Sequence, residues 1–110
     1  MAFHKKEEFG KKEQELAEIA KALSHPARIA ILKVLAQKAE CICGEIVEVL
    51  PLAQSTVSQH LKELKNAGLI KGTIEGTAIC YCLDASTFQK FGSYLAHIFK
   101  TLAAKKTSCC

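Results

Sequence analysis

The chain has 110 residues, of which 49% are hydrophobic and 24% are charged, and its formal net charge is +4. This composition excludes a disordered protein, and the length fits one domain over residues 1–110, with flexible ends at 1–8 and 105–110. The mild positive charge is compatible with binding a polyanion. No run approaches the roughly 18 apolar residues of a membrane span, and the N-terminus lacks the apolar segment of a signal peptide. We therefore expect a cytoplasmic protein with no membrane partner.

Apolar residues spaced three and four positions apart predict two helices in the first third of the chain. The first ends near Leu23, and the second runs to about Gln37. Between them lies Ser24-His25-Pro26, a typical helix start, because Ser or His can precede a helix and proline is tolerated in its first turn. A short third helix is predicted from Gly44 to Leu50, where the following proline ends it.

A fourth helix is predicted from Gln54 to about Gly68, with Gln54 or Ser55 at its cap. Glycine suits the left-handed conformation that commonly ends a helix. The apolar stripe that should face the core consists of Val57, Leu61 and Leu64.

Two β-like runs follow, at residues 69–74 and 78–83, and they predict a two-stranded hairpin. Asp84 then precedes a last helix whose broad apolar stripe indicates burial against more than a small monomer core. The predicted order is α-α-α-α-β-β-α. This is a mainly α fold with a small β-hairpin, a winged helix-turn-helix.

The first two turns of the fourth helix carry a set of polar side chains. Short hydroxyls and amides can approach base edges in the major groove of DNA, and a helix N-terminus attracts phosphate. An ordinary solvated helix face would have a similar composition, but the neighbouring helix and hairpin favour a DNA-reading helix. The candidate DNA-binding residues are Gln54, Ser55, Thr56, Ser58, Gln59, His60 and Lys62.

Three segments of the chain resemble the ArsR/SmtB family of bacterial metal-responsive repressors. They are LSHPAR at residues 23–28, QSTVSQHL at 54–61 and AGLI at 67–70, and the resemblance covers roughly residues 15–105. It implies a homodimer formed by the first and last helices. It also implies that the two recognition helices enter successive major grooves of a palindromic double-stranded operator. No cofactor is expected to be required for DNA binding.

The hairpin departs from the family pattern. Wings of this family often carry arginine at the tip, whereas the chain has a single arginine, Arg28, outside the wing. The tip at residues 72–77 has no basic residue, and Lys71 is the nearest cation in the hairpin. The contribution of the wing to DNA binding is therefore in question.

Cys41 and Cys43 flank one residue just before the predicted third helix. On a regular helix, side chains two positions apart point about 200° away from each other. These thiols can therefore share an ion only if the backbone is extended or unwound there. A metal that recruits both would distort the first element of the helix-turn-helix. The resemblance implies the same site, because family repressors of arsenite and antimonite carry Cys-x-Cys here.

Arsenite or antimonite, As(III) or Sb(III), is accordingly the expected inducer, and as a soft metalloid it favours three thiolates. The third cysteine of the family pattern is absent here. Cys109 and Cys110 in the tail are the candidates for the missing ligand, although a frayed end needs no such role. Cys80 and Cys82 are alternatives, because they face one side of a strand, but buried cysteines also serve as small apolar residues.

Other readings of the cysteines remain open. They could respond to another thiophilic ion such as Cd(II) or Zn(II), or to oxidants and persulfides. The family's second site, on the last helix, uses Asp and His pairs, whereas residues 86–104 offer only His97. An enzyme is not expected, because no Cys-x-x-Cys, phosphate loop or recognisable nucleophile–base pair is present.

Overall fold

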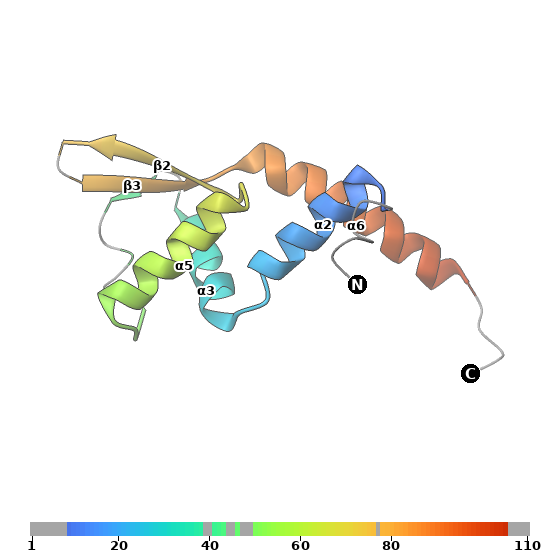
Figure 1. The fold of residues 1–110 in the computed structure, drawn as a ribbon, viewed down its shortest axis with the longest axis horizontal. Helices are drawn as coiled ribbons and strands as arrows, with labels where there is room; N and C mark the ends of the chain where they lie inside the picture. Colours follow the sequence, from blue (N-terminus) through green and yellow to red (C-terminus); the bar gives the residue numbers. More distant parts are fainter. Residues whose placement is uncertain (1–8, 39–40, 44–45, 47–49, 77, 106–110) are drawn as a thin grey trace.

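A computed structural model describes residues 9–38, 41–43, 46, 50–76 and 78–105 (Figure 1). The described elements are α2 (Lys11–Ala22), α3 (Pro26–Gln37), β1 (Ile42–Cys43), α5 (Gln54–Asn66), β2 (Ile70–Glu75), β3 (Ala78–Leu83) and α6 (Ala85–Ala104). The predicted winged helix-turn-helix order is confirmed for these elements. The short helix predicted at 44–50 lies almost entirely outside the described residues.

Local capping explains where two of the helices begin. His25 precedes α3, and its Nδ1 atom accepts a hydrogen bond of 3.0 Å from the Ala27 amide. Asp84 precedes α6, and its Oδ1 atom accepts one of 3.4 Å from the Thr87 amide. Both side chains satisfy amides that have no partner within the first turn of a helix. Both start signals in the sequence are thereby confirmed.

The expected cap of α5 was wrong. Ala53 holds the N-cap position and forms no side-chain cap bond. Its backbone is extended (φ −64°, ψ 149°), and its carbonyl accepts hydrogen bonds from the Thr56 and Val57 amides. Gln54 and Ser55 therefore lie inside the first turn, where their side chains are exposed.

The end of α5 directs the chain into the wing. Gly68 adopts φ +82°, the left-handed conformation expected of a terminating glycine. Its amide donates to the Lys65 carbonyl at 3.0 Å, and the Leu69 amide donates to the Leu64 carbonyl at 3.0 Å. This pair of bonds is a Schellman motif, and Leu64 and Leu69 are both fully buried beside it. The polar turn and the apolar contact together fix the angle between α5 and β2.

The core lies where α3, α5 and the sheet meet. The predicted stripe of α5 is buried, and it packs in one cluster with residues of α3, β1 and β2. Burying a side chain of this size contributes roughly 1.5–3 kcal/mol. The largest fully buried side chains are Ile31, Ile46, Val57, Leu64, Leu69 and Cys80.

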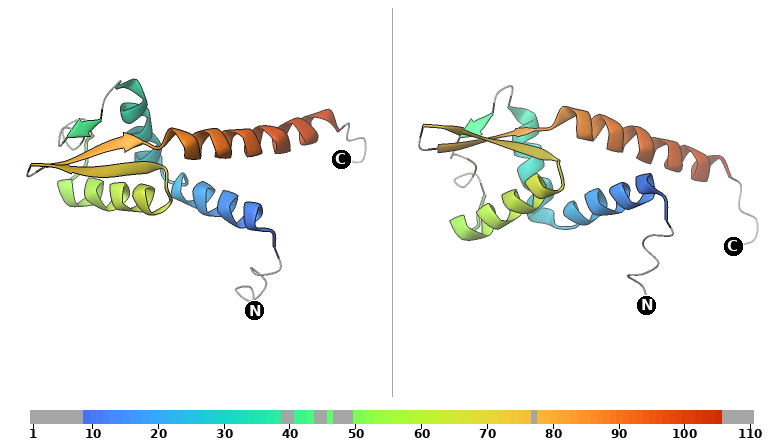
Figure 2. Two further views of the ribbon diagram at one scale, coloured as in Figure 1. Left: turned by 90° about the horizontal axis from the view of Figure 1, so that it is seen from above. Right: turned by 45° about the horizontal axis from the view of Figure 1, so that its top comes forward.

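The sheet has three strands in the order β1-β3-β2, all antiparallel, rather than the two expected from sequence (Figure 2). In β1, Ile42 pairs with Tyr81 and Cys43 pairs with Cys80. The added strand has two residues. Local periodicity cannot reveal so short a strand, because the strand exists only through its pairing with β3.

Helix α6 extends away from the sheet, and α2 lies beside it (Figures 1 and 2). An ion pair of 2.8 Å joins Lys90 of α6 to Glu15 of α2. The radius of gyration is 16.9 Å, larger than the roughly 13 Å of a compact chain of this length. No residue of α6 is buried. None of the described helices is long and apolar enough to cross a membrane.

Candidate functional site

One surface of α5 gathers most of the predicted DNA-binding residues. We call it the polar face of α5; its members are Gln54, Ser55, Thr56, Ser58, Gln59 and Lys62, all exposed. The buried stripe on the opposite side of α5 holds the helix against α3 and the sheet, so this face points away from the core. The Nε2 atom of Gln59 donates to Oε1 of Glu63 at 3.1 Å, which orients the amide on the surface.

His60 is placed differently from the other predicted DNA-binding residues. Its side chain is 8% exposed, and its ring centroid lies 4.5 Å from that of His25. Its Nδ1 atom accepts a hydrogen bond of 3.3 Å from Nε of Arg28. Arg28 also donates to the Ala22 carbonyl at 3.3 Å. The expected contact of His60 with base edges does not fit this placement, since the ring faces the body of the domain and connects α5 to the start of α3.

Burial lowers the pKa of His60 below its ordinary value, and the nearby His25 and Arg28 lower it further. Glu63 acts in the opposite direction but does not reverse the shift. The neutral imidazole is therefore the form that the folded domain accommodates, because protonation would place a third basic group beside two others.

Acid should destabilise the domain through this histidine. Below about pH 6.5 the unfolded chain takes up a proton at His60, whereas the folded chain resists it, so the free energy of unfolding falls as the pH falls. Urea unfolding between neutral and mildly acidic pH measures this slope. Replacing His60 with glutamine should flatten it, while His97→Gln, at an exposed position on α6, should leave it unchanged. An unchanged slope in His60→Gln would refute the assignment.

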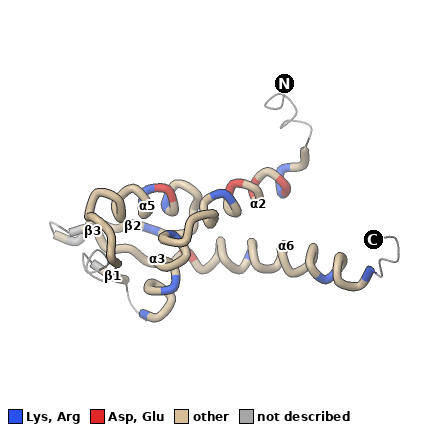
Figure 3. The backbone as a smooth tube through the Cα atoms, turned by 90° about the horizontal axis from the view of Figure 1, so that it is seen from below, with Lys and Arg blue, Asp and Glu red and all other residues tan. Residues whose placement is uncertain are grey.

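The wing carries its basic groups at its base rather than at its tip. Lys71 is exposed on β2. The Nζ atom of Lys65 lies 3.5 Å from the point where a Cβ on Gly72 would stand. Lys65 was not predicted to lie at the wing, because only the turn after α5 brings the end of that helix beside β2. At the tip, Ile74 is 80% exposed. Figure 3 shows the distribution of charge along the chain.

Two segments far apart in sequence bring cysteines together at the sheet. Cys41 and Cys82 are joined by a disulfide, and their Cα atoms are 4.6 Å apart. Cys43 occupies the ladder position opposite Cys80, whose side chain is fully buried and whose sulfur is also disulfide-bonded. We call Cys41, Cys43, Cys80 and Cys82 the thiol cluster. The extended backbone that Cys41 and Cys43 need in order to share a ligand is present, since Ile42–Cys43 is a strand.

The thiol cluster is not a ready-made metal centre. Among the described residues, no three His, Cys, Asp or Glu side chains converge as a group that could hold a metal ion. The side chain of Cys43 lies outside the described residues, as do Cys109 and Cys110. What the fold supplies is a backbone pairing that brings two Cys-x-Cys segments side by side, one on the edge strand β1 and one on the central strand β3. Thiols are donors that soft metals and metalloids prefer.

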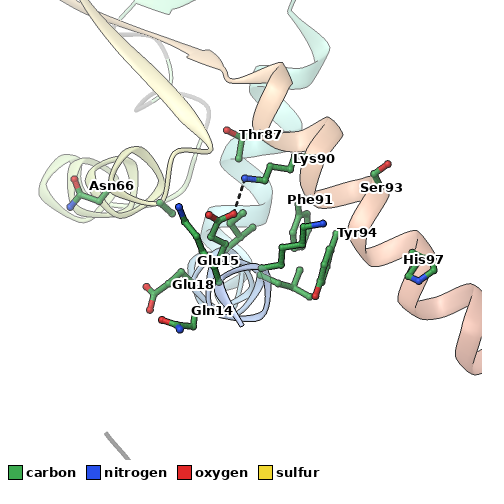
Figure 4. Close-up of a pocket in the computed structure, with 15 residues that line it drawn as sticks. Gln14, Glu15, Glu18, Asn66, Thr87, Lys90, Phe91, Ser93, Tyr94 and His97 are labelled. Atoms are coloured by element: carbon green, nitrogen blue, oxygen red, sulfur yellow. Dashed lines mark ion pairs between the residues drawn. The ribbon is translucent and has the colours of Figure 1, made fainter. Parts of the chain in front are cut away.

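A groove of about 980 Å³ separates α2 from α6 (Figure 4). The ion pair between Lys90 and Glu15 crosses it, and Lys90 lowers the pKa of that carboxyl by donating a hydrogen bond to it. Phe91 and Tyr94 line it from α6. Its lining is mixed, with apolar rings beside exposed charges.

Comparison with known proteins identifies the family. Residues 25–71 match the model described as "Bacterial regulatory protein, arsR family". The chain is 45% identical over 67 residues to the uncharacterized HTH-type transcriptional regulator MJ1325 of Methanocaldococcus jannaschii. The aligned segment covers 60% of this chain and 74% of that protein. The chain belongs to the ArsR family.

A second ArsR-family relative is the HTH-type transcriptional repressor SmtB of Mycobacterium tuberculosis. It is 42% identical over 81 residues, which span 74% of this chain and 54% of SmtB, about half its length. Among solved structures, an ArsR-like transcriptional regulator from Rhodococcus sp. RHA1 superposes with a TM-score of 0.71 at 26% identity, covering 86% of this chain and 92% of that one. The resemblance seen in the sequence is confirmed, and the chain is a winged helix-turn-helix DNA-binding transcriptional regulator.

Proposed function

We propose that this regulator is a repressor that binds a palindromic operator as a homodimer and is released by arsenite or antimonite. The observation that carries the proposal is the thiol cluster. Cys41 and Cys43 lie in the segment between α3 and the DNA-reading helix α5, and the sulfur of a third cysteine, Cys82, is bonded to that of Cys41. Three thiolates suit a soft trivalent metalloid.

The polar face of α5 is the surface that contacts the bases of the operator. Its amide and hydroxyl side chains are exposed, so they can enter the major groove and form hydrogen bonds with base edges. The amides of the first turn of α5 point to the same end, where they favour phosphate. His60 is left out of this set, because its ring supports the helix from the inner side.

Inducer binding is coupled to DNA release through β1. This strand leads toward the helix-turn-helix and is held to β3 of the wing, so a metalloid gathered between the two strands alters the placement of both. Coupling between two sites of a protein is typically about 1–3 kcal/mol, or about 5- to 150-fold in affinity.

Fluorescence anisotropy of labelled operator DNA tests the proposal. The operator is first selected from random duplexes, and the protein is reduced with a phosphine, because a dithiol would itself bind arsenite. Arsenite should release the wild-type protein, with an affinity change of about 5- to 150-fold. The double variant Cys41→Ser/Cys43→Ser should bind the same DNA and keep it in arsenite. Arsenate, which is not a thiophile, serves as the chemical control. Release of the double variant by arsenite would refute the site.

A different input to the same thiols has two observations in its favour. The disulfide between Cys41 and Cys82 shows that these sulfurs lie close enough to be oxidised as a pair. A relative that is 37% identical over 71 residues is named "Cadmium resistance transcriptional regulatory protein CadC homolog" from Staphylococcus aureus. Release by peroxide that a phosphine reverses would identify oxidation as the input. Release by Cd(II) or Zn(II) but not arsenite would identify a divalent ion.

A further inference from the structure

The pairing of β1 with β3 decides which thiols are neighbours. Ile42 and Tyr81 are paired across the two strands, and both pack on the core side of the sheet. Side chains alternate along a strand, so the positions on either side of this pair belong to the other face. Cys41 and Cys82 are neighbours on that face, with their Cα atoms 4.6 Å apart and their sulfurs bonded.

Such a pair can hold one ion after reduction. A metal–thiolate bond is about 2.3 Å long, so two thiolates on one centre lie within about 4.6 Å of each other. Sulfurs that are near enough to form a disulfide reach this separation with a small side-chain rotation. Cys82 is also partly accessible, being half-buried, whereas Cys80 is 0% exposed.

We propose that Cys82 of the wing supplies the third thiolate, so that arsenite or antimonite is held by Cys41, Cys43 and Cys82 across β1 and β3. The inference rests on the proposed function and names the ligand set of that site. Cys43 and Cys82 occupy diagonal positions of the ladder, which are about 7–8 Å apart at Cα. Two metal–sulfur bonds and two Cβ–Sγ bonds span this diagonal.

The tail of the same chain is poorly placed for the role. Helix α6 begins next to the end of β3 and has 20 residues, so its far end is about 30 Å from the sheet. Figure 1 shows that the sheet and α6 extend in opposite directions. Residues 105–110, even fully extended, reach back only about 20 Å. A thiol at Cys109 or Cys110 therefore falls short of Cys41 in its own protomer.

This ligand set extends beyond the segment that the family model matches. That segment ends at residue 71, so it contains Cys41 and Cys43 but not Cys82. Ligand binding would then connect the wing directly to the strand that precedes α5. Metalloid binding would also depend on the redox state of Cys82, because only its reduced thiol can ligate. The disulfide to Cys41 excludes the metalloid.

Arsenic X-ray absorption on the full-length, phosphine-reduced protein tests the inference, with arsenite as the probe. The wild type and the control Cys109→Ser/Cys110→Ser should each show about three sulfurs per arsenic, and Cys82→Ser about two, with an oxygen in place of the third. Three sulfurs in Cys82→Ser, or loss of one in the tail variant, would overturn it. Circular dichroism checks that Cys82→Ser is folded.

A second measurement needs no variant. The wild-type protein is alkylated with and without arsenite, and the modified peptides are identified by mass spectrometry. Arsenite should protect Cys41, Cys43 and Cys82 and leave Cys109 and Cys110 reactive; alkylation of Cys82 in the arsenite-bound protein would overturn the assignment. If Cys82 ligates but arsenite leaves operator binding unchanged, the inference stands and the proposed function fails.

Discussion

Replacing Phe99 with glutamate is expected to convert the protein to a monomer and to weaken operator binding by about 100-fold or more. Phe99 and Leu102 are 60% and 64% exposed on α6, a helix with no buried residue. An isolated domain has no reason to keep such a stripe in water, but a second copy can cover it. Dimerisation joins two DNA-reading helices, and linking two binding modules raises avidity by about 10²- to 10⁴-fold.

Sedimentation equilibrium measures the oligomeric state, and operator anisotropy measures the affinity. A charge buried in an apolar interface is costly, so the variant should dissociate without unfolding. Thr101→Glu is the matched control, because it adds the same charge at an exposed position about 200° around the helix from Phe99. If Phe99→Glu stays dimeric, α6 is not the interface.

Substitutions on the polar face of α5 are expected to separate affinity from specificity. Lys62→Ala should weaken binding to all DNA sequences alike and lower the salt slope by about one phosphate contact per protomer. Gln59→Ala should instead relax the preference at one base position in each half-site, by about 1–3 kcal/mol. The reason is that a lysine at the groove edge pairs with phosphate, whereas an amide forms paired hydrogen bonds with a base.

Anisotropy over a salt series, with the selected operator and with duplexes changed at single positions, measures both effects. Lys100→Ala removes the same charge from an exposed position on α6 and should leave the salt slope unchanged. Two results would contradict the assignment of this face: an unaltered salt slope in Lys62→Ala, or an unchanged base preference in Gln59→Ala.

Features determined by adjacent residues were predicted from sequence. His25 and Asp84 cap their helices, and Gly68 ends α5 in the left-handed conformation, because each acts on amides or carbonyls within a few positions. The buried stripe of α5 followed from helical periodicity. The same periodicity places His60 on that stripe, three residues after Val57 and four before Leu64. Its polarity, rather than its position, led to the wrong orientation.

Features determined by distant residues were not predicted. Strand β1 and the contact between Cys41 and Cys82 depend on pairing across a sequence separation of 41. No local pattern shows that the Cys-x-Cys segment at 41–43 pairs with the one at 80–82. The identity of the third thiolate ligand could therefore not be predicted from the sequence. Lys65 beside Gly72 depends in the same way on how the Schellman turn returns β2 along α5.

The bond between Cys41 and Cys82 turns part of the chain into a closed ring. That ring contains all of α5, the turn at Gly68 and the whole of β2. In the unfolded chain, closing a loop of this size removes conformational entropy equivalent to about 4 kcal/mol. A single proteolytic cut anywhere inside the ring opens it but separates nothing, because both halves stay covalently joined. Oxidation therefore adds a second covalent connection between the two ends of the segment that carries the DNA-reading helix.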